Sequence, residues 1–91
     1  MTAEHRVVVR IVNKKGLHAR ASAKIVEAAA RFQSRVMISK DGQCVDARSI
    51  MGLMMLAASP GTEVVVEADG PDAAAALAAI VALAKAKFGE D

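Results

Sequence analysis

Apolar residues along the chain follow two periods, one typical of strands and one of helices. Four short segments are rich in β-branched residues or alternate between apolar and polar positions, and they predict strands at 6–12, 35–40, 43–47 and 62–68. Between the first two, apolar residues recur at spacings of three and four, which predicts a helix from Ala19 to Phe32.

This first helix has the clearest two-sided pattern in the chain. Its apolar face consists of Leu17, Ala21, Ile25, Ala28 and Phe32. Its charged face consists of Arg20, Lys24, Glu27 and Arg31. A helix with one apolar side buries that side against a sheet and leaves the other in water.

Two further helices are predicted from their start and stop signals. Ser49 is a good N-cap for a short helix within the segment 49–58, SIMGLMMLAA, which Ser59-Pro60-Gly61 ends. The turn 69–72 leads into a last helix over 73–88, with Pro71 near its first position and acidic residues in its first turn. Asp41-Gly42 predicts a tight hairpin between the second and third strands.

The resulting order is β-α-β-β-α-β-α, which favours an α+β fold. Short turns between strands and one-sided helices predict a four-stranded antiparallel sheet with three helices on one face, a two-layer sandwich. The length of 91 residues allows one modest hydrophobic core, so we expect a single domain spanning 1–91.

Composition narrows the class of protein. Hydrophobic residues make up 54% of the chain, yet there are only two Phe and no Trp or Tyr, so aliphatic side chains must form the core. A dispersed net charge of +2 and few aromatic rings argue against nucleic-acid binding. The sequence has a single cysteine, Cys44, and its first segment lacks a signal-peptide pattern. The apolar stretch at 73–86 is too short to cross a bilayer. These features predict a soluble cytoplasmic protein without membrane contact.

His18 and Arg20 are the candidate chemical groups. Gly16 breaks the preceding strand, so both residues fall where a helix exposes unpaired backbone N–H groups and a partial positive charge. Such a site accepts anions and favours a neutral, nucleophilic imidazole, and Arg20 could bind phosphoryl oxygens. On spacing alone, an incidental histidine near an N-cap beside a solvated arginine is the favoured interpretation.

Other chemistries have little support in the residue pattern. His5 is remote in sequence from His18, and no pair of His or Cys residues has the spacing of a metal site. We therefore expect no metal and no cofactor.

The short helix after Ser49 carries an unusual number of methionines. If Ile50, Leu53 and Ala57 face the sheet, then Met51, Met54 and Ala58 point elsewhere, and a domain this small has little else to bury them in. Exposed methionine clusters typically bind protein partners. For Met55 we expect burial beneath a neighbouring helix. Ser49 is interpreted first as the N-cap of this helix. The functional alternative is a phosphorylation site, where a phosphate would add negative charge beside the apolar residues.

Two separated motifs are similar to those of one known family. GLHAR at 16–20, followed by a helix of small residues, and RSIMGLMML at 48–56 resemble HPr, the histidine-containing phosphocarrier family of the bacterial phosphoenolpyruvate-dependent phosphotransferase system. The resemblance extends over nearly the whole chain, including SPGTEVVVEADG and the closing helix, and implies an open-faced sandwich with a four-stranded antiparallel sheet.

The resemblance implies a role for each motif. His18 would be phosphorylated at Nδ1 by enzyme I, with Arg20 as its helper, and would pass the group to an enzyme IIA-type receiver. Ser49 corresponds to the residue that an HPr serine kinase/phosphorylase modifies in some bacteria. The partner-binding surface would comprise Leu17, Arg20, Lys24, Ile50, Met51 and Met54.

The chain departs from the family pattern at two positions. Ala21 stands where the family usually has proline, which frees a backbone N–H and loosens the first turn, although alanine favours a helix. Glu27 stands where many sugar-transport members carry lysine, so the receiver can belong to the sugar branch or to the nitrogen-regulatory branch.

Three functions fit these observations to different degrees. A phosphocarrier that visits successive partners, and is therefore expected to be a monomer, fits both motifs. A regulatory module that binds partners according to the phosphorylation state of Ser49 is the alternative. A small ligand-binding domain of a regulatory enzyme is a third, which the absence of a polar pocket pattern disfavours.

Overall fold

The structure, a computed structural model, describes residues 5–89, so the two ends of the expected domain 1–91 lie outside the described residues. Its elements follow the predicted order, with a short 3₁₀ turn, η1, added after the last helix. They are β1 (His5–Arg10), α1 (Ala19–Ala29), β2 (Arg35–Lys40), β3 (Gln43–Asp46), α2 (Ile50–Met55), β4 (Glu63–Asp69), α3 (Ala73–Lys85) and η1 (Lys87–Gly89).

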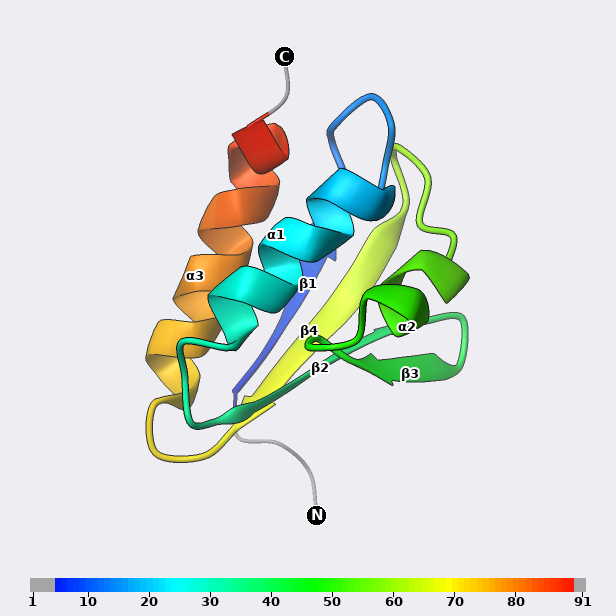
Figure 1. Ribbon diagram of the computed structural model, residues 1–91. Helices are drawn as coiled ribbons and strands as arrows, with labels where there is room; N and C mark the ends of the chain where they lie inside the picture. The colour runs from blue at the N-terminus through cyan, green and yellow to red at the C-terminus, as the bar shows by residue number, and fades with distance from the viewer. Residues whose placement is uncertain (1–4, 90–91) are drawn as a thin grey trace.

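The four strands form one antiparallel sheet in the order β1-β4-β2-β3. β4 lies between β1 and β2, with Val65 opposite Val8 on one side and Val66 opposite Ile38 on the other. All three helices lie on the same side of the sheet, with α1 and α3 side by side and α2 over the β3 end (Figure 1). The predicted α+β fold, an open-faced sandwich with a four-stranded antiparallel sheet and three helices on one face, is confirmed (Figure 1).

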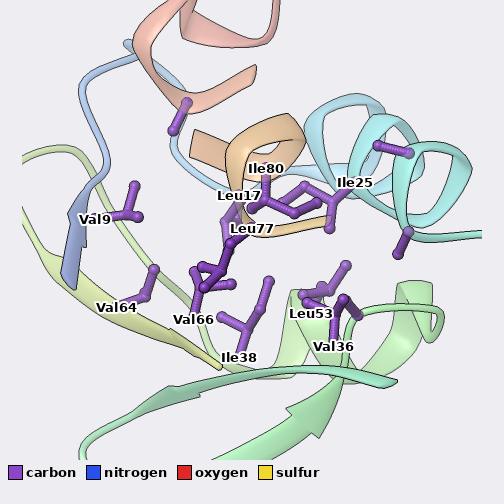
Figure 2. Packing of buried hydrophobic residues seen from close by; sticks show 14 of the residues in the cluster. Val9, Leu17, Ile25, Val36, Ile38, Leu53, Val64, Val66, Leu77 and Ile80 are labelled. Atoms are coloured by element: carbon purple, nitrogen blue, oxygen red, sulfur yellow. The ribbon is translucent and has the colours of Figure 1, made fainter. Parts of the chain in front are cut away.

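The core lies between the sheet and the helices. Alternate residues of β4 and β2, such as Val66 and Ile38, meet Ile25 of α1 and Ile80 of α3 there (Figure 2). Burying one aliphatic side chain of this size contributes roughly 1.5–3 kcal/mol, which makes this layer the main source of stability. Many of the helix residues that complete it are small: Ala21, Ala28, Ala29, Ala73, Ala76 and Ala84 are all buried.

The helices are shorter than the sequence pattern predicts. α1 ends at Ala29 rather than Phe32, because the N–H groups of Arg31 and Phe32 bond to carbonyls three residues earlier, in a tighter turn. α2 ends at Met55, and Ala57 then takes a left-handed φ of 53°. The apolar pattern alone does not show these changes, because apolar residues continue beyond each helix end.

The last helix also differs from its prediction at both ends. α3 ends at Lys85, and Lys87 and Phe88 both have φ of 56°, which the helical spacing does not predict. At its start, Asp72 is the N-cap and its first turn contains no acidic residue, so the expected placement of acids was wrong.

The Asp72 carboxylate instead fastens α3 to the loop before β2. It accepts hydrogen bonds from the Ser34 hydroxyl at 2.6 Å, the Ser34 N–H at 2.8 Å and the Gln33 N–H at 3.0 Å. The Ser34 hydroxyl in turn accepts from the Asp72 N–H at 3.0 Å. These bonds, the one from the Ser34 side chain foremost, hold the pKa of Asp72 below its ordinary value.

The loop between β1 and α1 is fixed by hydrogen bonds to backbone carbonyls, one from a side chain and one from the backbone. The Asn13 side-chain amide donates to the Gly16 carbonyl at 2.8 Å, and the Leu17 N–H donates to the Ala58 carbonyl at 2.9 Å. Gly16 has a φ of +64°, and a Cβ atom there would lie 2.3 Å from the Ala58 carbonyl oxygen. Only glycine combines this backbone conformation with so close an approach.

Replacing Gly16 with alanine should destabilise the fold more than an alanine at an equally left-handed but open site. Gly61 provides that control, because its φ is +88° and nothing lies within 4 Å of its Cβ position. We expect Gly61→Ala to cost about 1 kcal/mol from backbone strain alone and Gly16→Ala at least about twice as much, measured by urea unfolding. Equal losses would show that the approach to Ala58 is unimportant.

Asp72→Asn should make the protein less stable near neutral pH and change its response to acid. A lowered folded-state pKa contributes stability above the ordinary value of 3.8, and this contribution disappears as pH falls through the folded-state pKa. Urea midpoints of wild type and Asp72→Asn should therefore differ near pH 7 and converge as the pH falls through the folded-state pKa of Asp72. Asp69→Asn, at the exposed last position of β4, is the control, and an equal pH response in both variants would contradict the assignment.

Candidate functional site

His18 is the N-cap residue of α1. Its backbone is extended, with φ of −76° and ψ of 179°, and its Nδ1 accepts a hydrogen bond from the Arg20 N–H at 3.3 Å. Because a backbone N–H can only donate, Nδ1 is the ring nitrogen that presents a lone pair to this side. The ring is half-buried. The prediction that His18 stands at a helix N-terminus is confirmed.

A basic depression lies beside His18. Backbone N–H groups at the start of α1 and the positive end of the helix dipole already favour an anion at this point. The basic side chains around the depression add to that field, and residues 88 and 89 of η1 also line it. Its lining comprises Lys14, Lys15, His18, Ala19, Arg20, Lys24, Phe88 and Gly89.

Arg20 and Lys24 line the depression in different ways. Arg20 is exposed in the first turn of α1, where its guanidinium can move toward an anion. Lys24, one turn further, is half-buried, and its ammonium donates to the Phe88 carbonyl at 2.6 Å. The sequence pattern placed both on the charged face of α1, and it gave no sign of the bond to Phe88.

The start of α2 is formed by Ser49, as predicted. The Ser49 hydroxyl accepts from the Gly52 N–H at 3.0 Å, and the Ser49 backbone is extended. A Cβ atom at Gly52 would lie 3.0 Å from the Cβ of Val45, so this mid-helix glycine is explained by the close packing of α2 on β3.

Basic side chains fix the position of α2 at both ends. Arg48 donates to the carbonyl of Phe32, just after α1, at 2.6 Å. Lys40 donates to the carbonyl of Leu56, at the end of α2, at 3.3 Å and forms an ion pair with Asp41. A helix of six residues is too short to be stable by itself, so these contacts and the burial of its single core residue hold it in place.

Four large apolar side chains of α2 face solvent. Met51 is 71% exposed, Met55 67%, Met54 42% and Ile50 40%, whereas Leu53 is fully buried. The expectation that Ile50 faces the sheet and that Met55 is buried was wrong, because so short a helix presents only one core position. We call Ile50, Met51, Met54 and Met55 the α2 surface.

The residues after α2 connect this surface with His18. The left-handed turn at Ala57 reverses the predicted pattern, so Ala58 is buried and Ala57 is exposed. A second depression is lined by Lys15, Leu17, His18 and residues 57–60. Leu17 itself belongs to the core, with only 5% of its surface exposed, which leaves its side chain little area for a partner.

Several residues of the site were not identified from the sequence. Lys14 and Lys15 line the depression, and their position directly before Gly16 and His18 was a usable signal. Phe88 and Gly89 gave no signal, because nothing in the local sequence predicts that these two residues lie against α1. Within residues 5–89, no helix is long and apolar enough to span a membrane, and no three His, Cys, Asp or Glu side chains lie together as metal ligands.

Comparisons with known proteins agree with this site. A family model described as PTS HPr component phosphorylation site matches residues 6–86. The phosphocarrier protein HPr of Cupriavidus necator is 55% identical over 88% of this chain and 90% of its own length. The phosphocarrier protein NPr of Klebsiella oxytoca is 39% identical over 91% of this chain and 93% of its own.

Solved structures give the same result. The crystal structure of HPr from Thermoanaerobacter tengcongensis, in a form named HPr-C-His, superimposes with a TM-score of 0.92 at 44% sequence identity and covers 96% of this chain and 98% of its own. The fold, the basic site at His18 and the similarity over most of the sequence lead to one conclusion. The chain belongs to the HPr family of phosphocarriers of the phosphotransferase system.

Proposed function

We propose that this chain accepts a phosphoryl group from phospho-enzyme I on Nδ1 of His18 and transfers it to a histidine of an enzyme IIA-type receiver. The carrier acts as a cytoplasmic monomer that visits the two partners in turn. The observation that carries the proposal is the N-cap position of His18, whose Nδ1 faces the helix N-terminus at the edge of the basic depression.

The transfer is a displacement at phosphorus. The Nδ1 lone pair of His18 forms the new P–N bond while the bond from phosphorus to the donor breaks, and its electron pair remains with the donor. The hydrogen bond that Nδ1 accepts from Arg20 is long, at 3.3 Å, so little is lost when the lone pair is used. The Arg20 N–H is then free to donate to a phosphoryl oxygen.

The product must be stabilised enough to form but not so strongly that transfer stops. Backbone N–H groups, the α1 dipole and the exposed cations Lys14, Lys15 and Arg20 stabilise a dianion without burying it. The half-buried position of the ring also leaves the group accessible to the next partner.

The α2 surface, together with Arg20 and Lys24, provides the docking area for both partners. Methionine side chains adapt to different shapes, which suits a protein that binds an enzyme I and a receiver with the same face. The buried side chain of Leu17 supports this area from beneath rather than contacting partners.

Ser49 is proposed as a regulatory phosphorylation site for an HPr serine kinase/phosphorylase. Its hydroxyl caps α2, and a phosphate at a helix start is compatible with the fold. The added charge of about −2 would lie beside Ile50 and Met51 and would repel partners without unfolding the helix.

A nitrogen-regulatory role is the second candidate. The similarity to an NPr protein and the exposed Glu27 on α1 support it, whereas the HPr of Cupriavidus necator has the higher sequence identity. In that role the receiver differs, but the chemistry at His18 is the same.

Incubation with phosphoenolpyruvate and enzyme I should add one acid-labile phosphoryl group to the wild type and none to His18→Ala, as read by mass spectrometry. The labelled protein should then pass the group to an enzyme IIA-type receiver, and comparison of sugar-branch and nitrogen-branch receivers identifies the branch by the faster transfer. Equal labelling of His18→Ala, or an unlabelled wild type, would rule out the carrier function.

A negative charge on the α2 surface should weaken binding to enzyme I. We expect Met51→Glu and Ser49→Asp each to raise the Kd by about tenfold, because each places an unpaired charge in an apolar contact. Melting temperatures should change little for Met51→Glu, whose side chain is exposed. Ala75→Glu, at an exposed position of α3, is the matched control, and equal effects of all three variants would count against this docking area.

A further inference from the structure

We infer that Lys24 is a phosphoryl-binding residue whose ammonium is positioned by the C-terminal turn, residues 87–89. This role goes beyond docking and rests on the proposed function, because it concerns the group carried by His18. The observations are the bond from Lys24 to Phe88 and the shared depression that both residues line with His18.

The C-terminal turn has an unusual backbone. Lys87, Phe88 and Gly89 have φ of 56°, 56° and 77°, three consecutive left-handed residues, two of which carry side chains. Non-glycine residues rarely adopt this conformation, and they keep it only where surrounding contacts enforce it. Three contacts enforce this conformation here: the burial of the Phe88 side chain, the bond from the Gly89 N–H to the Ala86 carbonyl, and the bond from Lys24 to the Phe88 carbonyl.

The turn places the Lys24 ammonium at the wall of the depression. A Cβ atom at Gly89 would lie 2.6 Å from the Lys24 Nζ, so the glycine is part of the ammonium's binding site. A lysine has a flexible stem and is otherwise costly to hold in one position. The Phe88 carbonyl holds it there before the phosphoryl group arrives.

The bond to Phe88 leaves the charge of Lys24 available to an anion. A carbonyl oxygen is neutral, and an ammonium has three N–H donors, one of which accounts for the hydrogen bond recorded within residues 5–89. Arg20 and Lys24 are four residues apart on α1, so their stems are neighbours on one face of the helix. The two cations can therefore bind the same dianion, Arg20 with an exposed guanidinium and Lys24 with an ammonium held by the Phe88 carbonyl.

The alternative is that the bond only fastens the chain end to α1. An equilibrium measurement distinguishes a phosphoryl-binding role of Lys24 from this structural role. It also distinguishes both from a docking role, because the rates of partner binding do not affect the final distribution of the phosphoryl group between the two proteins. Equal amounts of wild type and Lys24→Met are mixed with a catalytic amount of enzyme I and too little phosphoenolpyruvate to label both. The phosphoryl group exchanges through enzyme I, one bond to phosphorus breaking as another forms, and mass spectrometry reads its final distribution.

We expect wild type to hold about five times more phosphoryl group than Lys24→Met, a typical effect for one partly solvated ion pair. Lys24→Arg, which keeps the charge, should restore most of the share. Lys85→Met, which removes the same charge from an exposed position outside the depression, should share equally with wild type. Gly89→Ala should lose part of the share, since it displaces the ammonium and alters no group that could bind phosphate.

Two outcomes overturn the inference. An equal distribution between wild type and Lys24→Met, even with a lower melting temperature in the variant, would leave Lys24 a purely structural contact. An equal loss in Lys85→Met would reduce the effect to net charge. Failure of enzyme I to label wild type at all would instead refute the proposed carrier function, so the two failures are distinguishable.

Discussion

The hydrogen bond from the Leu17 N–H to the Ala58 carbonyl is the contact on which the arrangement of the site depends. It joins the loop that carries His18 to the loop that follows α2, and the left-handed Gly16 allows the two backbones to approach. The His18 ring and the exposed apolar helix are therefore parts of one surface. In the proposed carrier, a partner docked on α2 would meet His18 at a fixed distance, which is the geometric control that group transfer requires.

The parts of this site that the sequence predicts are those determined by neighbouring residues. Gly16 ends one element and the periodic pattern from Ala19 begins the next, which leaves His18 as the cap by position alone. The role of Ser49 is also set by its neighbours, since a serine directly before an apolar helical segment is favoured as the N-cap. The alternation of the strands likewise indicated which residues face the helices, because side-chain direction in a strand follows directly from position.

The parts that the sequence does not predict depend on contacts between distant segments. Nothing near Lys24 indicates a bond to Phe88, 64 residues away, and nothing near Asp72 indicates that its carboxylate binds Ser34 rather than its own helix. The predicted burial of Met55 failed for a different reason. Met55 is the last residue of a six-residue helix whose only core position is Leu53, so its side chain faces solvent. The predicted sides of Ala57 and Ala58 were reversed because the helix ends before them.

The alanines buried between α1 and α3 have a consequence for the entropy of folding. A methyl side chain has no rotamers to lose when it is buried, whereas a larger aliphatic side chain loses about 0.5–1 kcal/mol of conformational freedom. Ala28 and Ala76 therefore contribute less hydrophobic free energy than leucine would, but their side chains also lose no rotamer freedom on folding. They leave the two helices in close contact with few alternative packings. A domain of this size, with no disulfide among its residues and almost no aromatic rings, thus obtains a single well-defined framework from small side chains rather than from large ones.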